Sequence, residues 1–247
     1  MTTGSDVGVV SYEQYYPVFA AMEREGLALN LHGEIPPTTD QGASTTDAIT
    51  VLNAEISFLP ILLNLHKRFP KLRIVLEHCT TAAAIQTVLS CGPTVAGTIT
   101  AHHLYLTVDS WAGNSFNFCK PVAKLPSDRA SLIEAATSGN PKFFLGSDSA
   151  PHPMSAKLGR KAAAGVYTQP YLMQYVTEIF EKAGKLDKLQ GFAAEFGRKF
   201  YGIEPDIREG KIVMLKRDVT VKDSVGGDDG IVLFRAGERL TWDVTWT

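Results

Sequence analysis

Short apolar runs alternate along the chain with longer segments whose apolar residues recur at helical spacing. The apolar runs, each of strand length, cover residues 27–31, 73–76, 95–100 and 143–146. The helical pattern covers residues 12–24, 48–69, 80–89 and 126–137. Strand-then-helix units in succession predict a parallel β/α architecture, because a helix is the usual connection between two parallel strands.

After residue 165 the pattern changes. Two further helices are predicted at 166–182 and 185–200, and a β-rich tail is predicted at 211–219, 231–234 and 240–244, around the loop VGGDDG. We therefore expect two parts, residues 1–202 with the β/α units and residues 203–247 as a β-rich extension. The loop at 36–46, rich in Pro, Thr, Ser and Gly, is expected to be a mobile surface connection.

The second helical segment, residues 48–69, is amphipathic, and we expect its apolar face to pack in the core. Pro60 should kink this helix or begin a new one, since proline removes a backbone hydrogen bond. The residues expected on the core face are Ile49, Leu52, Ile56, Leu59, Leu62, Leu63 and His66.

Polar side chains follow the predicted strands: His32 after the first, His78 after the second, His102 and His103 after the third, and Asp148 after the fourth. In a barrel the carboxyl ends of the strands meet at one mouth, so this recurrence favours a barrel over an open sheet. Four units make only half of a (β/α)8 barrel. We expect an α/β fold, a partial TIM barrel corresponding to its C-terminal half, with the small β-rich tail.

Neutral imidazoles and a carboxylate suit a divalent cation such as zinc, which makes His32, His78 and Asp148 candidate metal ligands. The structural alternatives are that Asp148 forms a turn or caps a helix and that each histidine only makes hydrogen bonds. His102 and His103 either support the mouth or are structural, and His66 is expected at the surface or in packing. The same two options, a solvated loop or steering of a dicarboxylate, apply to the basic group Lys157, Arg160 and Lys161.

Composition excludes several classes of partner. The net charge of −2 gives no electrostatic reason to expect nucleic acid or an anionic membrane, and no segment approaches the apolar length of a membrane span. The three cysteines are an odd number without CxxC spacing, which favours a reducing compartment, the cytosol. We therefore expect the chain to have a binding site for a small molecule.

The chain contains the four motifs LNLHGE, VLEHCTT, GTITAHHL and GSDSAPHP, the last followed by Lys157. Together they resemble dihydroorotases of the single-function bacterial and fungal type, members of the amidohydrolase superfamily. The resemblance implies reversible, zinc-dependent hydrolysis of (S)-dihydroorotate to N-carbamoyl-L-aspartate in pyrimidine biosynthesis. It also implies that the intact enzyme is a homodimer.

The same resemblance implies a TIM barrel with a centre of two Zn²⁺ ions, one bound by His32 and His78 and the other by Asp148. Asp148 would also carry the proton during catalysis. His152 and the backbone of Ala164 would hold the substrate carboxylate, the backbone of Lys120 would contact the pyrimidine ring, and His32 would also contact substrate.

The sequence departs from the family pattern in its metal ligands. The family has a His-x-His pair on its first strand and a carboxylated lysine on its fourth, and the six histidines here include no His-x-His. We expect the chain to correspond to the part of the family that follows the fourth strand. Two interpretations stay open: a dihydroorotase polypeptide, or a catalytically inactive dihydroorotase-like fragment with a structural or assembly role.

Overall fold

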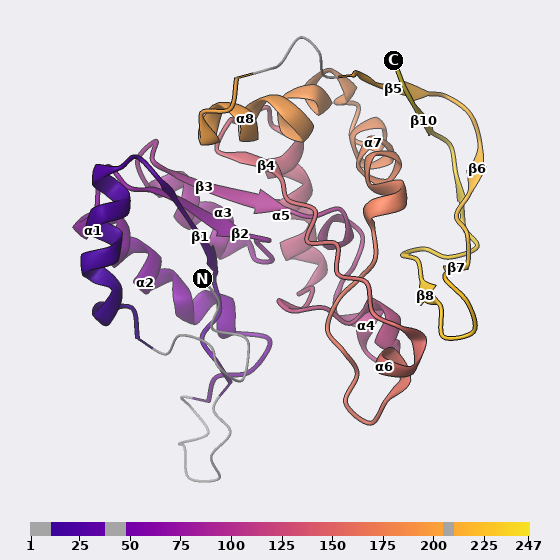
Figure 1. Cartoon of the computed structure of the whole chain (residues 1–247), viewed down its shortest axis with the longest axis horizontal. Helices are drawn as coiled ribbons and strands as arrows, with labels where there is room; N and C mark the ends of the chain where they lie inside the picture. The colour runs from indigo at the N-terminus through magenta and orange to yellow at the C-terminus, as the bar shows by residue number, and fades with distance from the viewer. Residues whose placement is uncertain (1–10, 38–47, 205–209) are drawn as a thin grey trace.

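The computed structural model describes residues 11–37, 48–204 and 210–247. Most of the predicted loop at 36–46 therefore lies outside the described residues. The core of the molecule is a sheet of parallel strands in the order β1-β2-β3-β4 (Figure 1). Its strands are β1 (Ala28–His32), β2 (Arg73–Glu77), β3 (Val95–Ile99) and β4 (Phe143–Leu145). The predicted strands and the α/β class are confirmed.

The register places equivalent strand ends side by side. Leu31 pairs with Leu76, Leu76 with Gly97, and Gly97 with Phe143. Side chains therefore alternate between the two faces of the sheet in step along all four strands. The polar residues that follow the strands therefore all lie at the same end of the sheet, where the strands have their carboxyl ends.

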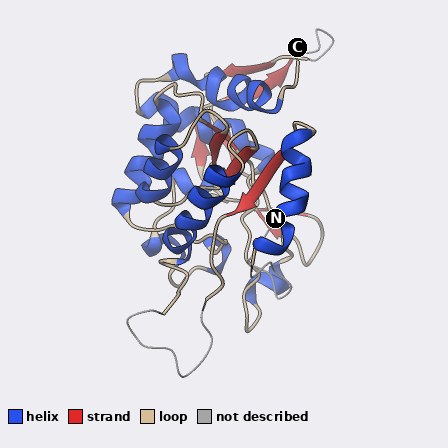
Figure 2. Ribbon diagram, turned by 90° about the vertical axis from the view of Figure 1, so that its left-hand side faces the viewer, coloured by secondary structure: helices blue, strands red, loops and turns tan. Residues whose placement is uncertain are grey.

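Helices surround the sheet (Figure 2). They are α1 (Tyr16–Arg24), α2 (Ala54–Arg68), α3 (Ala82–Ser90), α4 (Val108–Trp111), α5 (Pro126–Thr137), α6 (Met154–Leu158), α7 (Leu172–Lys182) and α8 (Phe196–Tyr201). Local sequence explains two helix starts: the Thr81 side chain accepts the Ala84 N–H at 3.0 Å, and Pro126 occupies the first position of α5.

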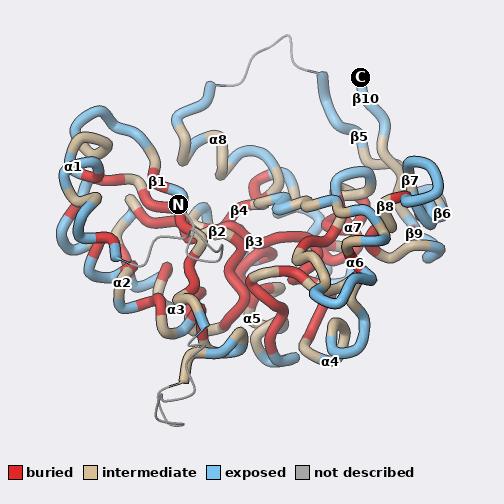
Figure 3. The backbone as a smooth tube through the Cα atoms, turned by 60° about the horizontal axis from the view of Figure 1, so that its bottom comes forward, coloured by how far each residue is buried: buried red, intermediate tan, exposed pale blue. Residues whose placement is uncertain are grey.

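The sheet packs on both faces, and its central strands are the most buried part of the chain (Figure 3). Ile74 and Leu76 of β2 join the main core with Phe58 and Leu62 of α2. Val75, between them, faces the other way and belongs to a second cluster with Ala96 and Phe144, against which the aromatic residues of α8 pack. Burial on both faces explains why Ile74, Val75 and Leu76 of β2 form a continuous apolar run.

The structure corrects the expected core face of α2. The helix begins at Ala54 and continues through Pro60. Leu59 and Leu62 are buried as expected, but the remaining core face is Phe58 and Leu65. Three residues predicted to face the core are instead about half exposed: Leu52 (50%), Ile56 (48%) and Leu63 (44%).

Two later helices are shorter than predicted. Residues 166–171 are not α-helical, because Val166 forms a parallel bridge with Ser149 and a 3₁₀ turn covers Gln169–Tyr171 before α7 begins. Within 185–200 the chain forms a 3₁₀ turn at Leu186–Lys188 and a π-helical turn at Gly191–Glu195 before α8.

The predicted β-rich tail is present as three antiparallel pairs. β5 (Ile212–Leu215) pairs with β10 (Asp243–Trp246), β6 (Val219–Thr220) with β9 (Arg239–Leu240), and β7 (Ser224–Val225) with β8 (Ile231–Val232). The tail packs on α7, where the Tyr175 hydroxyl donates to the Phe234 carbonyl at 2.5 Å. The division of the chain at residue 203 stays a prediction.

Among the described residues, none of the helices combines the length and the apolar character that crossing a bilayer requires.

Candidate functional site

The three candidate metal ligands line one cavity at the carboxyl ends of the strands. The cavity has a volume of about 490 Å³, and its lining comprises Asn30, His32, Glu77, His78, Thr98, Gly146, Ser147 and Asp148. His32 is the last residue of β1, His78 follows β2, and Asp148 lies just beyond β4. The parallel register thus brings together residues that are up to 116 positions apart in the sequence.

His32 and His78 face each other, with His32 Nδ1 3.1 Å from His78 Nε2. Two imidazole nitrogens bound to one tetrahedral zinc ion at 2.0–2.1 Å would be about 3.3 Å apart. Glu34 fixes the tautomer of His32, because its Oε2 accepts the Nε2 proton at 3.0 Å and leaves the Nδ1 lone pair directed at His78. A carboxylate behind a ligating histidine is a typical feature of zinc sites.

His78 is buried, and burial together with the neighbouring His32 holds its pKa well below the ordinary histidine value. The ring is therefore neutral at pH 7, the form that binds metal. Among the described residues its Nδ1 atom has no hydrogen-bond partner. The donor set thus fits a divalent cation held by His32 and His78.

Asp148 has a carboxyl group poised to exchange protons near neutral pH. Burial raises its pKa to about 6, with Glu77 adding to the increase and His32 opposing it. Its side chain is 36% exposed, so a ligand in the cavity can reach it. A carboxyl group with a pKa near 7 is suited to general acid–base catalysis.

Two of the candidate ligands have left-handed backbone conformations, with φ of 43° at His78 and 39° at Asp148. Such values are uncommon for residues other than glycine and cluster at functional sites. Gly146 lets the chain pass close to β3, because a Cβ atom at this position would lie 2.8 Å from Thr98 Cβ.

Sequence reasoning did not select the polar network beneath the site. The Thr98 hydroxyl donates to Glu77 Oε2 at 2.5 Å and accepts the His78 N–H at 2.7 Å. Burial raises the pKa of Glu77, and the Thr98 hydrogen bond partly opposes this. The available signal was positional, since Glu34, Glu77 and Thr98 all lie within the motifs at the strand ends.

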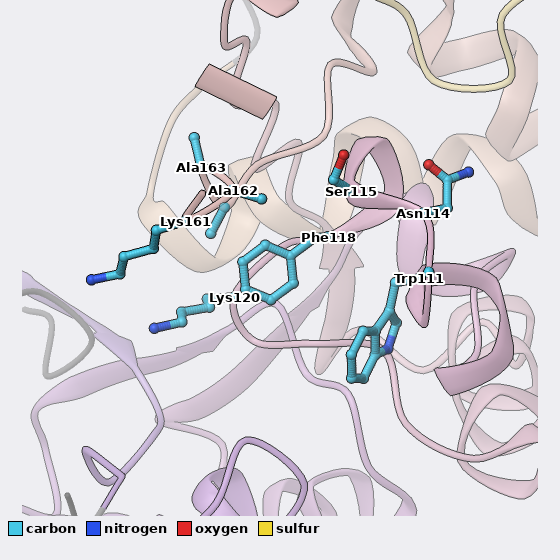
Figure 4. A pocket seen from close by; sticks show the side chains of 10 residues that line it. Trp111, Asn114, Ser115, Phe118, Lys120, Lys161, Ala162 and Ala163 are labelled. Carbon is cyan, nitrogen blue, oxygen red and sulfur yellow. The ribbon is translucent and has the colours of Figure 1, made fainter. Parts of the chain in front are cut away.

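The expected substrate residues Lys120 and Ala164 line a second cavity, of about 730 Å³. Its walls are residues 111–120, which include Trp111 and Phe118, and residues 161–164 (Figure 4). The backbone N–H groups of Lys120 and Ala164 have no acceptor in the described part of the chain. His152 lies next to this wall, where its Nε2 donates to the Ala164 carbonyl at 3.0 Å.

Lys157 is neither in a solvated loop nor available to steer a ligand, which corrects the expectation for this residue. It is only 4% exposed, because α6 turns its side chain inward. Its ammonium group donates to the carbonyls of Phe118, Ala163 and Gly165 at 3.0, 2.9 and 2.8 Å. Lys157 therefore ties together the two walls of the larger cavity.

The other histidines separate into different roles. His103 is structural: its Nε2 donates to the Pro121 carbonyl at 3.0 Å, so its Nδ1 accepts from Thr100 at 2.8 Å. His103 and Cys119 lie close to His102, in a group that could in principle hold a metal ion. Because His103 Nε2 carries a proton, it has no lone pair with which to bind a cation there. His66 accepts the Gly92 N–H at 3.0 Å, a packing role.

His102 lies buried beside Asp148, at the carboxyl ends of the strands. It is fully buried, and burial lowers its pKa to about 3, so the ring is neutral. Its Nε2 lies 4.0 Å from Asp148 Oδ2, and neither ring nitrogen has a hydrogen-bond partner within the described residues.

Known proteins resemble the chain over almost its whole length. A probable dihydroorotase of Schizosaccharomyces pombe is 56% identical over 245 residues, which cover 99% of this chain and 70% of that protein. The dihydroorotase of Saccharomyces cerevisiae is 44% identical over 261 aligned positions, covering 71% of that protein. No protein-family model matches. The chain thus spans about 70% of the length of these relatives.

Solved structures agree. The crystal structure of Saccharomyces cerevisiae dihydroorotase in complex with 5-fluoroorotic acid has a TM-score of 0.91 at 44% identity, covering 98% of this chain and 70% of that one. A D-hydantoinase from Thermus sp. has a TM-score of 0.82 at 12% identity, covering 100% of this chain and 61% of that one, and shares the fold alone.

Proposed function

The chain belongs to the dihydroorotase family, and on that premise we propose which of its residues perform the family's reaction. The reaction is the reversible hydrolysis of the ring amide of dihydroorotate to N-carbamoyl-L-aspartate, a step of pyrimidine biosynthesis. The fold is the matching part of an amidohydrolase TIM barrel. The observation that carries the assignment is the pair of facing nitrogens of His32 and His78, with Glu34 behind them.

We assign Zn²⁺ as the metal, with His32 and His78 as ligands of one ion and Asp148 as a ligand of a second. The neutral ring of His78 and the fixed tautomer of His32 support this choice. When bound, zinc lowers the pKa of a water molecule and polarises the amide carbonyl.

Asp148 moves the proton in this proposal. In the hydrolytic direction its carboxylate takes a proton from the attacking water and delivers it to the departing ring nitrogen. In the biosynthetic direction the order is reversed. A pKa of about 6 supports both proton uptake and proton release by Asp148, because neither its acid nor its base form is strongly disfavoured at pH 7.

The substrate residues are His32, His152, Lys120 and Ala164. The N–H groups of Lys120 and Ala164, which have no acceptor among the described residues, support this assignment because they offer donors to a carbonyl or carboxylate oxygen. The Ala164 carbonyl holds the His152 ring against the same wall. A homodimer and a cytosolic location belong to the proposal, the latter supported by three buried, unpaired cysteines.

The alternative is a dihydroorotase-like chain that is inactive by itself and has a structural or assembly role. The lack of a His-x-His pair in the sequence favours it, because the residues present supply only part of a two-metal ligand set.

Zinc titration calorimetry combined with a ring-opening assay distinguishes the two proposals. We expect zinc binding that is lost in His32→Ala and His78→Ala and kept in the control His66→Gln. If the chain turns over dihydroorotate, Asp148→Asn should slow it by about 10²–10⁴-fold. Zinc binding without turnover would support the alternative, and failure to bind zinc would contradict the metal assignment.

A further inference from the structure

Two lysine side chains project from opposite walls of the larger cavity. Lys120 belongs to the wall formed by residues 111–120 and Lys161 to the wall formed by residues 161–164. Figure 4 shows both side chains extending in the same direction, with their ammonium nitrogens on the same side of the cavity. The aromatic rings of Trp111 and Phe118 lie toward the other side.

In the part of the chain that the structure describes, no counter-ion pairs with either lysine. Within the described residues, neither Lys120 nor Lys161 makes an ion pair or donates a side-chain hydrogen bond. Two like charges on one cavity repel each other, and an anion bound between them would remove this cost. The N–H groups of Lys120 and Ala164 on the same walls, which no described residue accepts, add neutral donors.

The walls that carry the lysines are fixed to each other. The buried ammonium group of Lys157 binds the carbonyls of Phe118 and Ala163, and the Gly165 N–H donates to the Phe118 carbonyl at 2.9 Å. Each lysine therefore starts from a backbone position set by the fold, and only the side chains have to adjust to a ligand.

We propose that the side chains of Lys120 and Lys161 form a recruiting site for a ureido dicarboxylate, whose two carboxylates pair with the two ammonium groups before the ligand moves to the metal site. This inference rests on the proposed function and extends it, because the family resemblance assigns only the backbone of Lys120 to substrate and assigns nothing to Lys161. The two cations favour the open-chain dianion over the cyclic monoanion, since only the dianion offers a carboxylate to each lysine.

Isothermal titration of the chain with N-carbamoyl-L-aspartate and with dihydroorotate tests this, both with added Zn²⁺ and after chelation. We expect Lys120→Gln and Lys161→Gln each to weaken binding of N-carbamoyl-L-aspartate by about two- to fivefold, with a smaller loss for dihydroorotate. The loss should shrink as salt is added, because exposed charges are screened. The control Lys185→Gln removes the same charge from an exposed position outside the cavity and should change nothing.

Failure of this inference and failure of the proposed function give different results. The inference is overturned if the wild-type chain does not bind N-carbamoyl-L-aspartate, if the double variant binds it as tightly as wild type, or if Lys185→Gln has the same effect. Inorganic phosphate that competes equally well at the same site would mean a general anion site and would overturn the substrate assignment. Lysine-dependent binding without turnover or zinc binding would contradict the proposed function alone. Melting curves confirm that the variants are folded.

Discussion

Glu34 shows how one residue prepares a metal site before any metal is bound. Its carboxylate accepts the Nε2 proton of His32, so the lone pair of Nδ1 is directed at His78. Without this contact the ring would exchange between two tautomers, and only one of them presents Nδ1 to a cation.

We predict that Glu34→Gln lowers the zinc affinity of the chain by about 10–100-fold, because an amide is a weaker partner for the His32 N–H. Zinc titration calorimetry measures this, with Glu13→Gln as the control because Glu13 is exposed and does not line the cavity. Equal affinities for Glu34→Gln and wild type would show that Glu34 does not position the histidine.

At the scale of secondary structure, Glu55 links two helix starts. It lies in the first turn of α2 and is almost fully buried. Its carboxylate accepts the Thr80 N–H at 2.8 Å and the Thr81 hydroxyl at 2.5 Å, at the beginning of α3. Burial nevertheless dominates and raises the pKa of Glu55 to about 7.

This pKa predicts a pH-dependent stability. The folded state binds the Glu55 proton more tightly than the unfolded chain does, so the contribution is complete below the unfolded pKa of 4.5 and is lost as the pH rises through about 7. The free energy of unfolding should therefore fall by up to about 3 kcal/mol between pH 4.5 and pH 8 from this group.

Urea unfolding at a series of pH values measures the effect. Glu55→Gln should flatten the pH profile relative to wild type, because glutamine does not titrate. Glu13→Gln, at an exposed position, should leave the profile unchanged. Identical slopes for wild type and Glu55→Gln would contradict the prediction. Asp148, whose pKa is also raised, keeps its own contribution in all three proteins and cancels in the comparison.

Helix α2 also shows why its core face was partly mispredicted. Ile56, Leu59 and Leu63, together with Leu52 just before the helix, form one apolar stripe, and Phe58, Leu62 and Leu65 form an adjacent one. Both stripes satisfy helical periodicity, so the sequence alone does not say which of them meets the sheet. In the folded chain the second stripe packs on the core and much of the first remains exposed.

At the scale of the whole molecule, the exposed part of the first stripe and the sheet edges favour association. Among the described strands, β1 pairs only with β2 and β4 only with β3, which leaves two edges. Ile56 and Leu63 of α2, and Leu52 just before it, add exposed apolar area. Exposed apolar side chains mark contact sites or cause aggregation where they gather into a patch.

We predict that the chain is not a stable monomer and that the triple variant Leu52→Lys, Ile56→Lys and Leu63→Lys shifts it toward the monomer. Size-exclusion chromatography with light scattering measures this. Leu186→Lys, at an exposed leucine beyond α7, is the matched control and should not change the mass. A sharp monomeric peak with cooperative melting for the wild-type chain would contradict the prediction.

Much of the site could be anticipated because strand ends are visible in the sequence. His32, His78 and Asp148 each follow an apolar run, and parallel pairing brings such positions to one edge. Lys157 was misinterpreted because its three carbonyl partners come from residues 118, 163 and 165, and a basic residue in a polar segment looks solvated from sequence. The Thr98 contact with Glu77 depends in the same way on two neighbouring strands.

The sequence by itself determined the four strands, the helices that follow them and the chemical types at the strand ends, because periodicity and residue type are local properties. Only the tertiary structure decided which apolar stripe of α2 is buried, which nitrogen of His32 faces His78, and that Lys157 is a buried brace between two loops. These outcomes depend on contacts between residues distant in the chain, and burial changes both the hydrogen-bond partners and the pKa values that such residues have.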